Sequence, residues 1–465
     1  MLYNIGIIGL GTMGYNLAQN MIDKGFTVAG CDKSAEKVNN TNGQQSREKY
    51  LANTNSQLFV QSLELPRKII LLVPAGKIVD DVLNELLPFL SKADIVIDAG
   101  NSHFTDTLRR VQSLQKNELH FMGMGVSGGE EGARFGPSIM PGGNVDAWKA
   151  LQPILEAISA KVNGEPCVAY MGKDAAGHYV KMVHNGIEYA IMQLIAETYD
   201  LLKNGCGYSN EDLEKLYTGW NDGMLQSFLM EITAEVFKKK DDTGNALLLD
   251  MVLDKAKQKG TGKWTSQDAM DVQVPIPTID AAVIARDISA YKDERIALSK
   301  IYSGNRQPTA WHKEEAGNIV QNALLCAVII SYAQGLSLLA TASTELKMEI
   351  PLKDVVKIWR GGCIIRSVLL KNFYTAFEKD PALVNLLFDE TVASLLKENM
   401  NGLRQLVSEA SLKGFPVAAF SASLGYIDAF SSERLPVNLI QAQRDFFGAH
   451  TYERIDREGI FHTQW

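Results

Sequence analysis

One short segment, residues 177–189, carries a base, an acid and two further polar side chains at helical spacing. On a helix these four residues fall at positions i, i+3, i+4 and i+7 of one face, within about two turns of each other. They are Lys181, His184, Asn185 and Glu188. A second stripe of the segment is apolar and can seat the helix in a core. The pattern indicates a reaction centre, and the alternative interpretation is the solvated face of a surface helix.

The chain opens with a pattern typical of a cofactor site. An apolar run at residues 5–8 leads into GLGTMG at 9–14 and then into a segment of helical periodicity. In such a strand, turn and helix, Gly9 would allow the tight turn, Gly11 the approach of a pyrophosphate, and Gly14 the packing of helix on strand. A second apolar strand, residues 26–31, ends where the adenosine ribose is expected to lie. We therefore predict that this unit binds a dinucleotide.

Further apolar segments at 68–75 and 95–102 are separated by a helical stretch that runs through residue 90, which predicts a parallel sheet covered on both faces. Loops that follow such strands line the ligand crevice, so residues 73–76 and 100–102 are predicted to face the cofactor. Glycines crowd together between residues 123 and 143. We predict that they bring backbone close to a ligand and offer amide donors to an anion; a set of tight turns is the alternative.

Strand signals fade after residue 176, and long helical periodicities follow. Residues 183–190 align with 320–327, and each copy is followed by a tryptophan segment, at Trp220 and at Trp359. This repetition predicts a duplicated helical unit, with chance similarity of two apolar helices as the alternative. The second copy has Gln321, Leu325 and Cys326 where the first has a histidine, a glutamate and a tyrosine, so the helical scaffold does not itself require the titratable groups.

Basic side chains outside this repeat are candidates for anion binding. Residues 258–265 read as a basic, glycine-rich loop, but they lack the spacing of a phosphate-binding P-loop. Lys259, Lys263 and Arg286 can instead bind a phosphate or carboxylate as ordinary charged donors, or the lysines can simply be solvated. The last segment, 435–465, is rich in arginine, histidine and aromatic residues, which is unusual for a disordered tail, and we predict that it docks on a surface.

Composition limits the class of protein. A chain of 465 residues predicts two or three domains. The net charge of −8 disfavours non-specific binding to nucleic acid or to an anionic membrane. The longest apolar run, 323–330, is far below the length of a membrane span, and the first residues show no signal-peptide pattern. The five cysteines form no CxxC pair, so we expect reduced thiols, no zinc site and a cytoplasmic protein.

These motifs together resemble the decarboxylating 6-phosphogluconate dehydrogenases over essentially the whole chain. The stretches that carry the resemblance are 9–14, 100–102, 125–134, 177–189, 258–265, 292–295 and 441–452. The resemblance implies an α/β Rossmann-type dinucleotide-binding domain at 1–176, and a large all-α domain with an internal helical duplication at 177–434. It also implies a short C-terminal tail, 435–465, that reaches into the active site of the partner subunit in a homodimer.

The resemblance further implies oxidative decarboxylation of 6-phosphogluconate to ribulose 5-phosphate and CO2 with reduction of NADP, a step of the pentose phosphate pathway and of gluconate utilization. Lys181 would be the general base at the substrate 3-hydroxyl, and Glu188 the general acid that protonates C1. No metal is expected.

Two sets of binding residues follow from the same resemblance. Those implied to hold the substrate are Asn101, Ser127, Gly128, Gly129, His184, Asn185, Tyr189, Lys259, Arg286, Arg444 and His450. Those implied to bind the cofactor are Gly9, Leu10, Gly11, Thr12, Met13, Gly14, Asp32, Lys33, Ser34, Val73, Pro74, Ala75 and Asn101.

The sequence departs from the family pattern near the cofactor. NADP-using members commonly have Asn-Arg-Thr or Asn-Arg-Ser where this chain has Asp32-Lys33-Ser34. An acidic group there favours NAD, because it bonds a free 2′-hydroxyl and repels a 2′-phosphate, whereas the lysine and serine can bind that phosphate. We expect NADP, with NAD as the alternative. Pro74 replaces a common lysine, and Ala99 replaces a glycine, which is tolerated if its φ is negative.

Two other functions share part of this sequence pattern. A hydroxyisobutyrate-type dehydrogenase shares the glycine turn and a lysine base, but such chains are much shorter and lack the duplicated helical unit and the basic tail. A non-catalytic dinucleotide-sensing or scaffolding protein predicts loss of the reactive residues, yet Lys181, Glu188, Arg286 and His450 are present.

Overall fold

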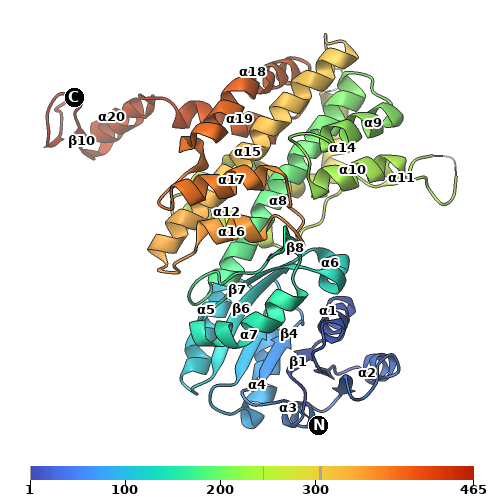
Figure 1. Ribbon diagram of the computed structural model, residues 1–465. Coiled ribbons are helices and arrows are strands. Elements are labelled where there is room, and N and C mark those ends of the chain that lie inside the picture. Colours follow the sequence, from blue (N-terminus) through green and yellow to red (C-terminus); the bar gives the residue numbers. More distant parts are fainter. Residues whose placement is uncertain (1, 245, 303–305) are drawn as a thin grey trace.

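The computed structural model describes residues 2–244, 246–302 and 306–465, which form a sheet-containing part, a helical part and a projecting tail (Figure 1). The sheet consists of β1 (Ile5–Ile8), β2 (Val28–Cys31), β3 (Tyr50–Asn53), β4 (Lys68–Leu71), β5 (Ile95–Asp98), β6 (His120–Ser127) and β7 (Ser138–Gly142). Its helices are α1 (Thr12–Asp23), α2 (Ala35–Asn42), α3 (Ser56–Gln61), α4 (Lys77–Leu86), α5 (Phe104–Gln115), α6 (Gly129–Phe135) and α7 (Val145–Ile158).

The strands follow the order β3-β2-β1-β4-β5-β6-β7. Apolar residues of α1 and α7 cover one face of this sheet, and those of α3 and α4 cover the other, so the strands are buried on both sides. Two features differ from the sequence prediction. Strands β3, β6 and β7 were not predicted: β3 has four residues of which only two are buried, and β6 and β7 lie in the glycine-rich stretch that was interpreted as ligand-binding backbone or tight turns. Strand β7 pairs antiparallel with β6, so the sheet is mixed rather than wholly parallel; as an edge strand it accommodates Pro141.

The helical part begins with α8 at Ala176. Its helices are α8 (Ala176–Asp200), α9 (Asn210–Asn221), α10 (Phe228–Lys238), α11 (Leu248–Met251), α12 (Thr261–Asp271), α13 (Pro277–Ala290), α14 (Lys292–Ile301), α15 (Lys313–Glu345), α16 (Leu352–Ile358), α17 (Leu369–Lys379), α18 (Glu390–Leu412) and α19 (Ala418–Phe430). Together with the sheet-containing part, this arrangement confirms the predicted fold class.

Helix α15 is the central helix of the helical part. By length and composition it is apolar enough to cross a membrane, but 89% of its apolar window is buried inside the structure. It packs against α8 and α18, and its residues belong to one continuous apolar core with those of α8. Helix α15 is thus accounted for as the core helix of a folded domain.

The two predicted repeat copies lie on the two long helices, α8 and α15, which pack against each other. Gly335 of α15 lies so close to Ile187 of α8 that an added Cβ would fall 2.5 Å from the isoleucine side chain. The segments after the tryptophans also pair reciprocally, since Phe228 N donates to Arg366 O and Val368 N donates to Gln226 O. This reciprocity supports the interpretation of a duplicated unit.

The tail consists of α20 (Val437–Gly448), β10 (Tyr452–Glu453) and β11 (Ile460–Phe461), and it projects away from the helical part (Figure 1). It folds around Asp445, whose side chain is fully buried. This carboxylate accepts hydrogen bonds from the backbone N–H of Thr451 and Thr463 and from the indole N–H of Trp465, and it lies 2.9 Å from His462 Nδ1. The tail is therefore an ordered unit with its own polar centre.

Candidate active site

Helix α8 lies directly on β6 and β7 because glycines line the contact. An added Cβ at Gly125 would fall 2.4 Å from Lys181 Cβ, and one at Gly142 would fall 2.2 Å from the backbone N of Gly177. At Gly123 it would meet the His178 ring at 2.8 Å. These three glycines were predicted to approach a ligand or to form turns. The structure corrects this: they let the backbone of α8 approach the sheet.

The ammonium group of Lys181 lies at the centre of a buried polar cluster. Lys181 Nζ is 3.4 Å from His184 Nδ1, and that nitrogen is 3.1 Å from Asn185 Oδ1. The other ring nitrogen, Nε2, is 3.2 Å from Ser127 Oγ at the end of β6. Lys181 is 7% exposed, and burial lowers its pKa, although Glu188 acts in the opposite direction. The cluster can therefore hold a neutral amine beside a hydroxyl-bearing ligand.

Glu188 lies one turn beyond His184, with its Oε2 3.8 Å from His184 Nδ1. Burial raises the pKa of this carboxyl, while the charges of Lys181 and Arg286 lower it. The same burial, with the lysine charge, holds the pKa of His184 well below its usual range, so the imidazole is neutral. Two titratable groups with oppositely shifted pKa values therefore share one largely buried helix face.

The next residue on α8, Tyr189, forms a second contact region. The Arg286 guanidinium of α13 stacks over the Tyr189 ring at 3.4 Å from its centroid. Gly262 of α12 makes room for this ring, because an added Cβ would fall 2.4 Å from Tyr189 Cδ2. The stacked guanidinium keeps its donors available for an anion.

The glycine turn before α1 has open space for a ligand. Gly9 has a φ of +97°, and a Cβ at Gly14 would fall 1.9 Å from the Gly9 carbonyl oxygen. A Cβ at Gly11, in contrast, would meet nothing within 4 Å. The exposed N-terminus of α1 thus presents backbone N–H groups at a site where a pyrophosphate fits.

Asp32, after β2, is held by its own loop. Its carboxylate accepts hydrogen bonds from Leu10 N at 2.8 Å and from Ser34 N at 2.9 Å. Burial raises the pKa of Asp32, but these bonds and the Lys37 ammonium lower it overall, so the group is ionised. The Lys33 side chain is 81% exposed and forms only an exposed ion pair, 3.7 Å long, with Glu85, so its ammonium group can exchange this partner for a ligand anion.

Two further loops follow β4 and β5. In the first, Pro74 and Ala75 are exposed. In the second, Asn101 is exposed, and Asp98 at the strand end accepts hydrogen bonds from Gly100 N at 3.0 Å and Ser102 Oγ at 2.6 Å. Ala99 has a negative φ and is buried, which meets the condition set for its replacement of glycine.

Comparison with known proteins identifies the family. The model described as "NAD binding domain of 6-phosphogluconate dehydrogenase" matches residues 4–184, and the one described as "6-phosphogluconate dehydrogenase, C-terminal domain" matches residues 177–465. The chain belongs to the 6-phosphogluconate dehydrogenase family.

Individual members of the family match this chain over its full length. The NADP(+)-dependent, decarboxylating 6-phosphogluconate dehydrogenase of Bacillus subtilis is 50% identical over 99% of this chain and 98% of that protein. The decarboxylating enzyme of Escherichia coli K12 is 48% identical over the same shares. A solved structure of Plasmodium falciparum 6-phosphogluconate dehydrogenase is 42% identical, covers 99% of this chain and 100% of its own, and has a TM-score of 0.96. The predicted resemblance is confirmed.

Within this family member, one chain brings together only part of the predicted substrate site. Lys181, His184, Asn185 and Ser127 meet in one cluster, next to Glu188. Gly128 and Gly129, both with positive φ, begin α6 beside Ser127. Lys259 is exposed just before α12, and the predicted loop 258–265 is corrected here, because α12 already begins at Thr261. Arg444 and His450 are exposed on the tail and form no part of this cluster.

The second tryptophan segment contributes residues that the sequence interpretation missed. The Ile364 backbone N–H donates to Ser127 Oγ at 3.4 Å, and Trp359 packs edge-on against the His184 ring at 5.6 Å. Gly362, with a φ of +68°, lies against Gly128, where an added Cβ would fall 2.5 Å from the Gly362 carbonyl oxygen. The sequence predicted this segment only as part of the repeat. Its adjacent glycines, Gly361 and Gly362, were the feature that could have indicated a close backbone contact.

The side chains that could bind a metal ion are His, Cys, Asp and Glu. Among residues 2–244, 246–302 and 306–465, no three His, Cys, Asp or Glu side chains are grouped so that they could hold a metal ion. The absence of a metal requirement stays a prediction. All five cysteines are free, and four of them are buried.

Proposed function

We propose that this protein oxidises and decarboxylates 6-phosphogluconate to ribulose 5-phosphate and CO2, with NADP as hydride acceptor. The observation that carries the proposal is the pair of buried Lys181 and partly buried Glu188 on one face of α8, in a chain similar to a decarboxylating family member over 99% of its length. The glycine turn and the Lys181 cluster provide a site for each reactant. When bound, NADP supplies the acceptor for the hydride that leaves C3 of the sugar acid.

Lys181 acts first in this proposal, as the general base. Its amine is neutral when the substrate binds, because burial lowers its pKa. It takes the proton of the 3-hydroxyl while C3 loses its hydride, which leaves a ketone at C3. The carboxylate is then β to that ketone. The protonated Lys181 stabilises the negative charge that develops on the C3 oxygen as the C1–C2 bond of the acid breaks and CO2 departs.

Glu188 acts last. Loss of CO2 leaves an enediol, which needs a proton on the carbon that carried the carboxylate. Burial raises the pKa of the Glu188 carboxyl, which favours its protonated form, and in this proposal it delivers that proton to give ribulose 5-phosphate. The two groups therefore act at successive steps on neighbouring carbons of the substrate.

The remaining polar groups are proposed to hold the substrate. Ser127, Gly128, Gly129, His184, Asn185 and Asn101 would bind its carboxylate and hydroxyls, and Tyr189, Lys259, Arg286, Arg444 and His450 would bind its phosphate. The neutral state of His184 suits a role as hydrogen-bond partner rather than as a charge. The cationic residues supply the local positive field that a chain of net charge −8 otherwise lacks.

For the cofactor we propose NADP. The ionised carboxylate of Asp32 is already engaged by two backbone donors of its own loop, so it has less capacity for a ribose hydroxyl than a free aspartate would have. The exposed Lys33 and the Ser34 hydroxyl are the proposed partners of the 2′-phosphate. NAD is the alternative cofactor, and Asp32 is the residue that would favour it.

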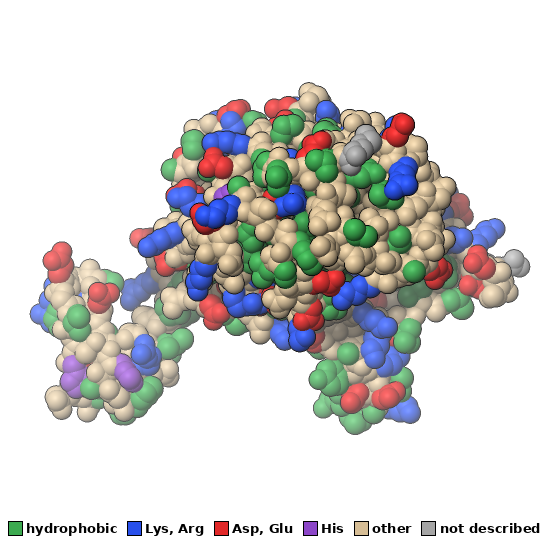
Figure 2. Space-filling model, turned by 90° about the horizontal axis from the view of Figure 1, so that it is seen from below, with side chains coloured by type: hydrophobic (Ala, Val, Ile, Leu, Met, Phe, Trp, Pro, Cys, Tyr) green, Lys and Arg blue, Asp and Glu red, His purple; other side chains and the backbone are tan. Residues whose placement is uncertain are grey.

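We further propose a cytoplasmic homodimer in which the tail of one subunit completes the active site of the other. Large apolar side chains are left uncovered on α13 and on the tail: Ile284, Ile288, Tyr291, Leu439, Ile440, Phe446 and Phe447 are each more than half exposed. Figure 2 shows the tail as a separate lobe with hydrophobic and histidine side chains at its surface. Such faces are stable in water when another chain covers them.

A direct assay tests the proposed reaction. Purified protein with 6-phosphogluconate and NADP is expected to form reduced cofactor and CO2 in equal amounts, measured by absorbance and by trapping of CO2 from C1-labelled substrate. Reduced cofactor without CO2 would indicate a simple dehydrogenase and would contradict the proposal. Replacing NADP by NAD in the same assay determines the cofactor preference.

A further inference from the structure

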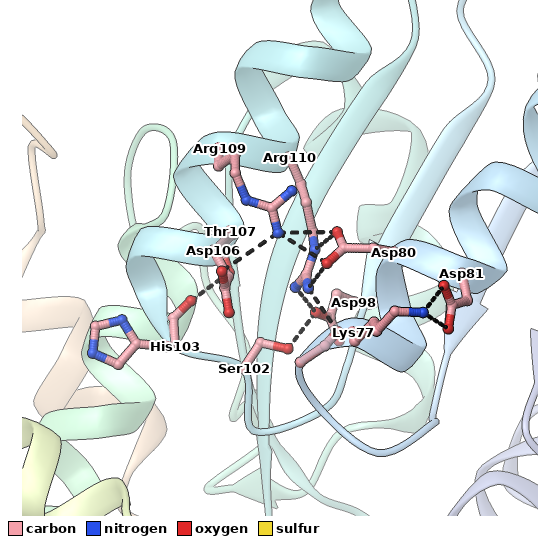
Figure 3. A network of polar contacts seen from close by, with 11 residues as sticks. Lys77, Asp80, Asp81, Asp98, Ser102, His103, Asp106, Thr107, Arg109 and Arg110 are labelled. Carbon is pink, nitrogen blue, oxygen red and sulfur yellow. Dashed lines mark hydrogen bonds and ion pairs between the residues drawn. The ribbon is translucent and has the colours of Figure 1, made fainter.

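Arg110 of α5 is a buried arginine that takes no part in the proposed chemistry, and its side chain is 1% exposed. Its guanidinium donates to both oxygens of Asp80 on α4, from Nε at 2.9 Å and from Nη2 at 3.1 Å. Nη1 lies 3.4 Å from Asp98 Oδ2 at the end of β5. Figure 3 shows this guanidinium between the two carboxylates, with Arg109 reaching the same Asp80 from the outer side.

The same guanidinium also bonds the loop after β4. Nη2 donates to the Gly76 carbonyl oxygen at 2.9 Å. Gly76 ends the loop that contains Pro74 and Ala75, and its φ of +89° fixes the turn into α4. Arg110 thus fixes the last residue of loop 73–76, which is proposed to face the cofactor.

Asp98 extends the contact to the loop after β5. Its carboxylate has no exposed surface and accepts hydrogen bonds from Gly100 N and from Ser102 Oγ, on either side of Asn101. Asn101 is the residue that is proposed to contact both cofactor and substrate. One guanidinium is therefore bonded to the anchors of both loops.

Helix α5 makes a third connection one turn before Arg110. Thr107 Oγ1 lies 2.6 Å from Nδ1 of the buried His178 on α8, one turn before Lys181. A single helix thus contacts the two loops of the sheet-containing part and the helix that carries the proposed base and acid.

Burial of this charge requires a reason beyond stability. Taking an arginine and an aspartate out of water costs several kcal/mol per ion, and packed apolar residues of similar size often stabilise a fold as well or better. The bidentate geometry of Arg110 on Asp80 does, however, fix relative positions in a way that apolar packing does not. Its geometry therefore indicates a role in setting positions.

We propose that Arg110 is a positioning residue that holds the cofactor loop 73–76 and the loop of Asn101 at a fixed spacing, and that this spacing sets the position of the cofactor relative to the substrate. The inference rests on the proposed roles of these two loops. Lysine cannot replace arginine here, since a single ammonium does not span Asp80, Asp98 and the Gly76 carbonyl group together.

Three variants test this. Arg110→Lys is expected to raise both the dissociation constant for NADP and the KM for 6-phosphogluconate about tenfold, the change that about 1.4 kcal/mol produces. Ser102→Ala removes one of the two bonds that hold the second loop to Asp98 and leaves the first loop intact, so it should raise the KM for 6-phosphogluconate and should raise the dissociation constant for NADP less than Arg110→Lys does. The matched control is Arg109→Lys, on the exposed neighbour that reaches Asp80 but neither loop, and its constants should be unchanged.

The double variant Arg110→Lys/Ser102→Ala gives a further readout. Because Ser102 acts through the carboxylate that Arg110 holds, the combined effect on KM should be smaller than the product of the two single effects. Unchanged ligand constants in Arg110→Lys, with only a lower melting temperature, would show a structural role and overturn the inference. If Arg110→Lys does not fold, an unchanged KM for 6-phosphogluconate in Ser102→Ala would also overturn the inference. NADP binding, measured by fluorescence without substrate, separates these outcomes from a failure of the proposed reaction.

Discussion

At the scale of single residues, Lys181 owes its chemistry to its surroundings. It is buried beside a neutral imidazole, and the opposing carboxyl group of Glu188 has itself a raised pKa. A lysine in water would be protonated at neutral pH and unable to accept a proton. Burial therefore favours the neutral amine that the proposed base role requires.

Lys181→Met tests the proposed base. The variant keeps a long apolar side chain in the same space, so cofactor binding should persist while turnover falls by at least about 10²- to 10⁴-fold, the usual contribution of a general base. Steady-state rates and NADP fluorescence titration measure the two effects separately. Lys173→Met, at an exposed lysine that pairs with Glu349, is the control. Retained turnover in Lys181→Met would exclude the role.

The pH dependence follows from the two pKa shifts. Activity should rise with pH as Lys181 loses its proton, below the pH at which an ordinary lysine does so, because burial lowers its pKa. It should fall again as Glu188 loses its proton, above the pH of an ordinary glutamate, because burial raises its pKa. We therefore expect a bell-shaped profile of kcat for the wild-type protein.

Glu188→Gln should remove the alkaline limb of that profile and lower kcat about 10²-fold or more, because glutamine cannot donate the final proton. Full pH–rate profiles of both proteins give the comparison. An alkaline limb that persists in the glutamine variant would assign it to another group.

Lys33 bears on the cofactor preference. Lys33→Ala should raise the KM for NADP about five- to tenfold and leave the KM for NAD unchanged, because only NADP carries the 2′-phosphate. Lys24→Ala, at an exposed lysine after α1, is the control. An equal effect on both cofactors would show that Lys33 does not bind the 2′-phosphate.

At the scale of elements, the glycine turn and the polar stripe of α8 were predictable because each depends on spacing within a few residues. The contact between α8 and the sheet was not predictable, because its glycines pair with residues 35 to 56 positions away and no local signal shows which face they line. The contacts of residues 359–364 with Ser127 and His184 were not predictable either, because these residues are also distant in the sequence. Strand β3 escaped prediction because it is short and half-buried.

Gly125→Ala tests the close contact of α8 with β6. The new methyl group would fall 2.4 Å from Lys181 Cβ, so we expect a loss of about 1–3 kcal/mol in the free energy of unfolding together with lower activity. Gly219→Ala is the matched control, because an added Cβ in that position of α9 meets nothing within 4 Å. Chemical denaturation gives both values, and equal stability of the two variants would contradict the packing argument.

At the scale of the whole molecule, the exposed apolar side chains of α13 and α20 and the projecting tail are the features on which the proposed homodimer rests. The predicted positions of Arg444 and His450 in the phosphate site were inferred from resemblance, and no single chain can test them because the proposed site lies in the other subunit. Sequence periodicity cannot reveal such contacts, since they depend on a second copy.

Hybrid dimers test the exchanged tail. One subunit carries Lys181→Met with an intact tail, and the other carries Arg444→Ala and His450→Ala with an intact Lys181. Each homodimer should be nearly inactive at low substrate, whereas purified hybrids should recover about half of the wild-type activity, since one complete site forms across the interface. Hybrids without recovered activity would show that the tail does not act on the partner subunit.

The glycine contacts between α8 and the sheet also restrict motion. Because backbone lies on backbone at Gly142 and Gly177, with no layer of side chains between them, the two parts of the chain have little room to rotate about this seam. We therefore expect substrate entry and product release in the proposed reaction to use smaller movements of exposed segments, such as the one before α12 and the tail. Exchange of backbone amide hydrogens should accordingly be slow along α8 and β6 and fast in the segment before α12 and in the tail, both with and without ligands.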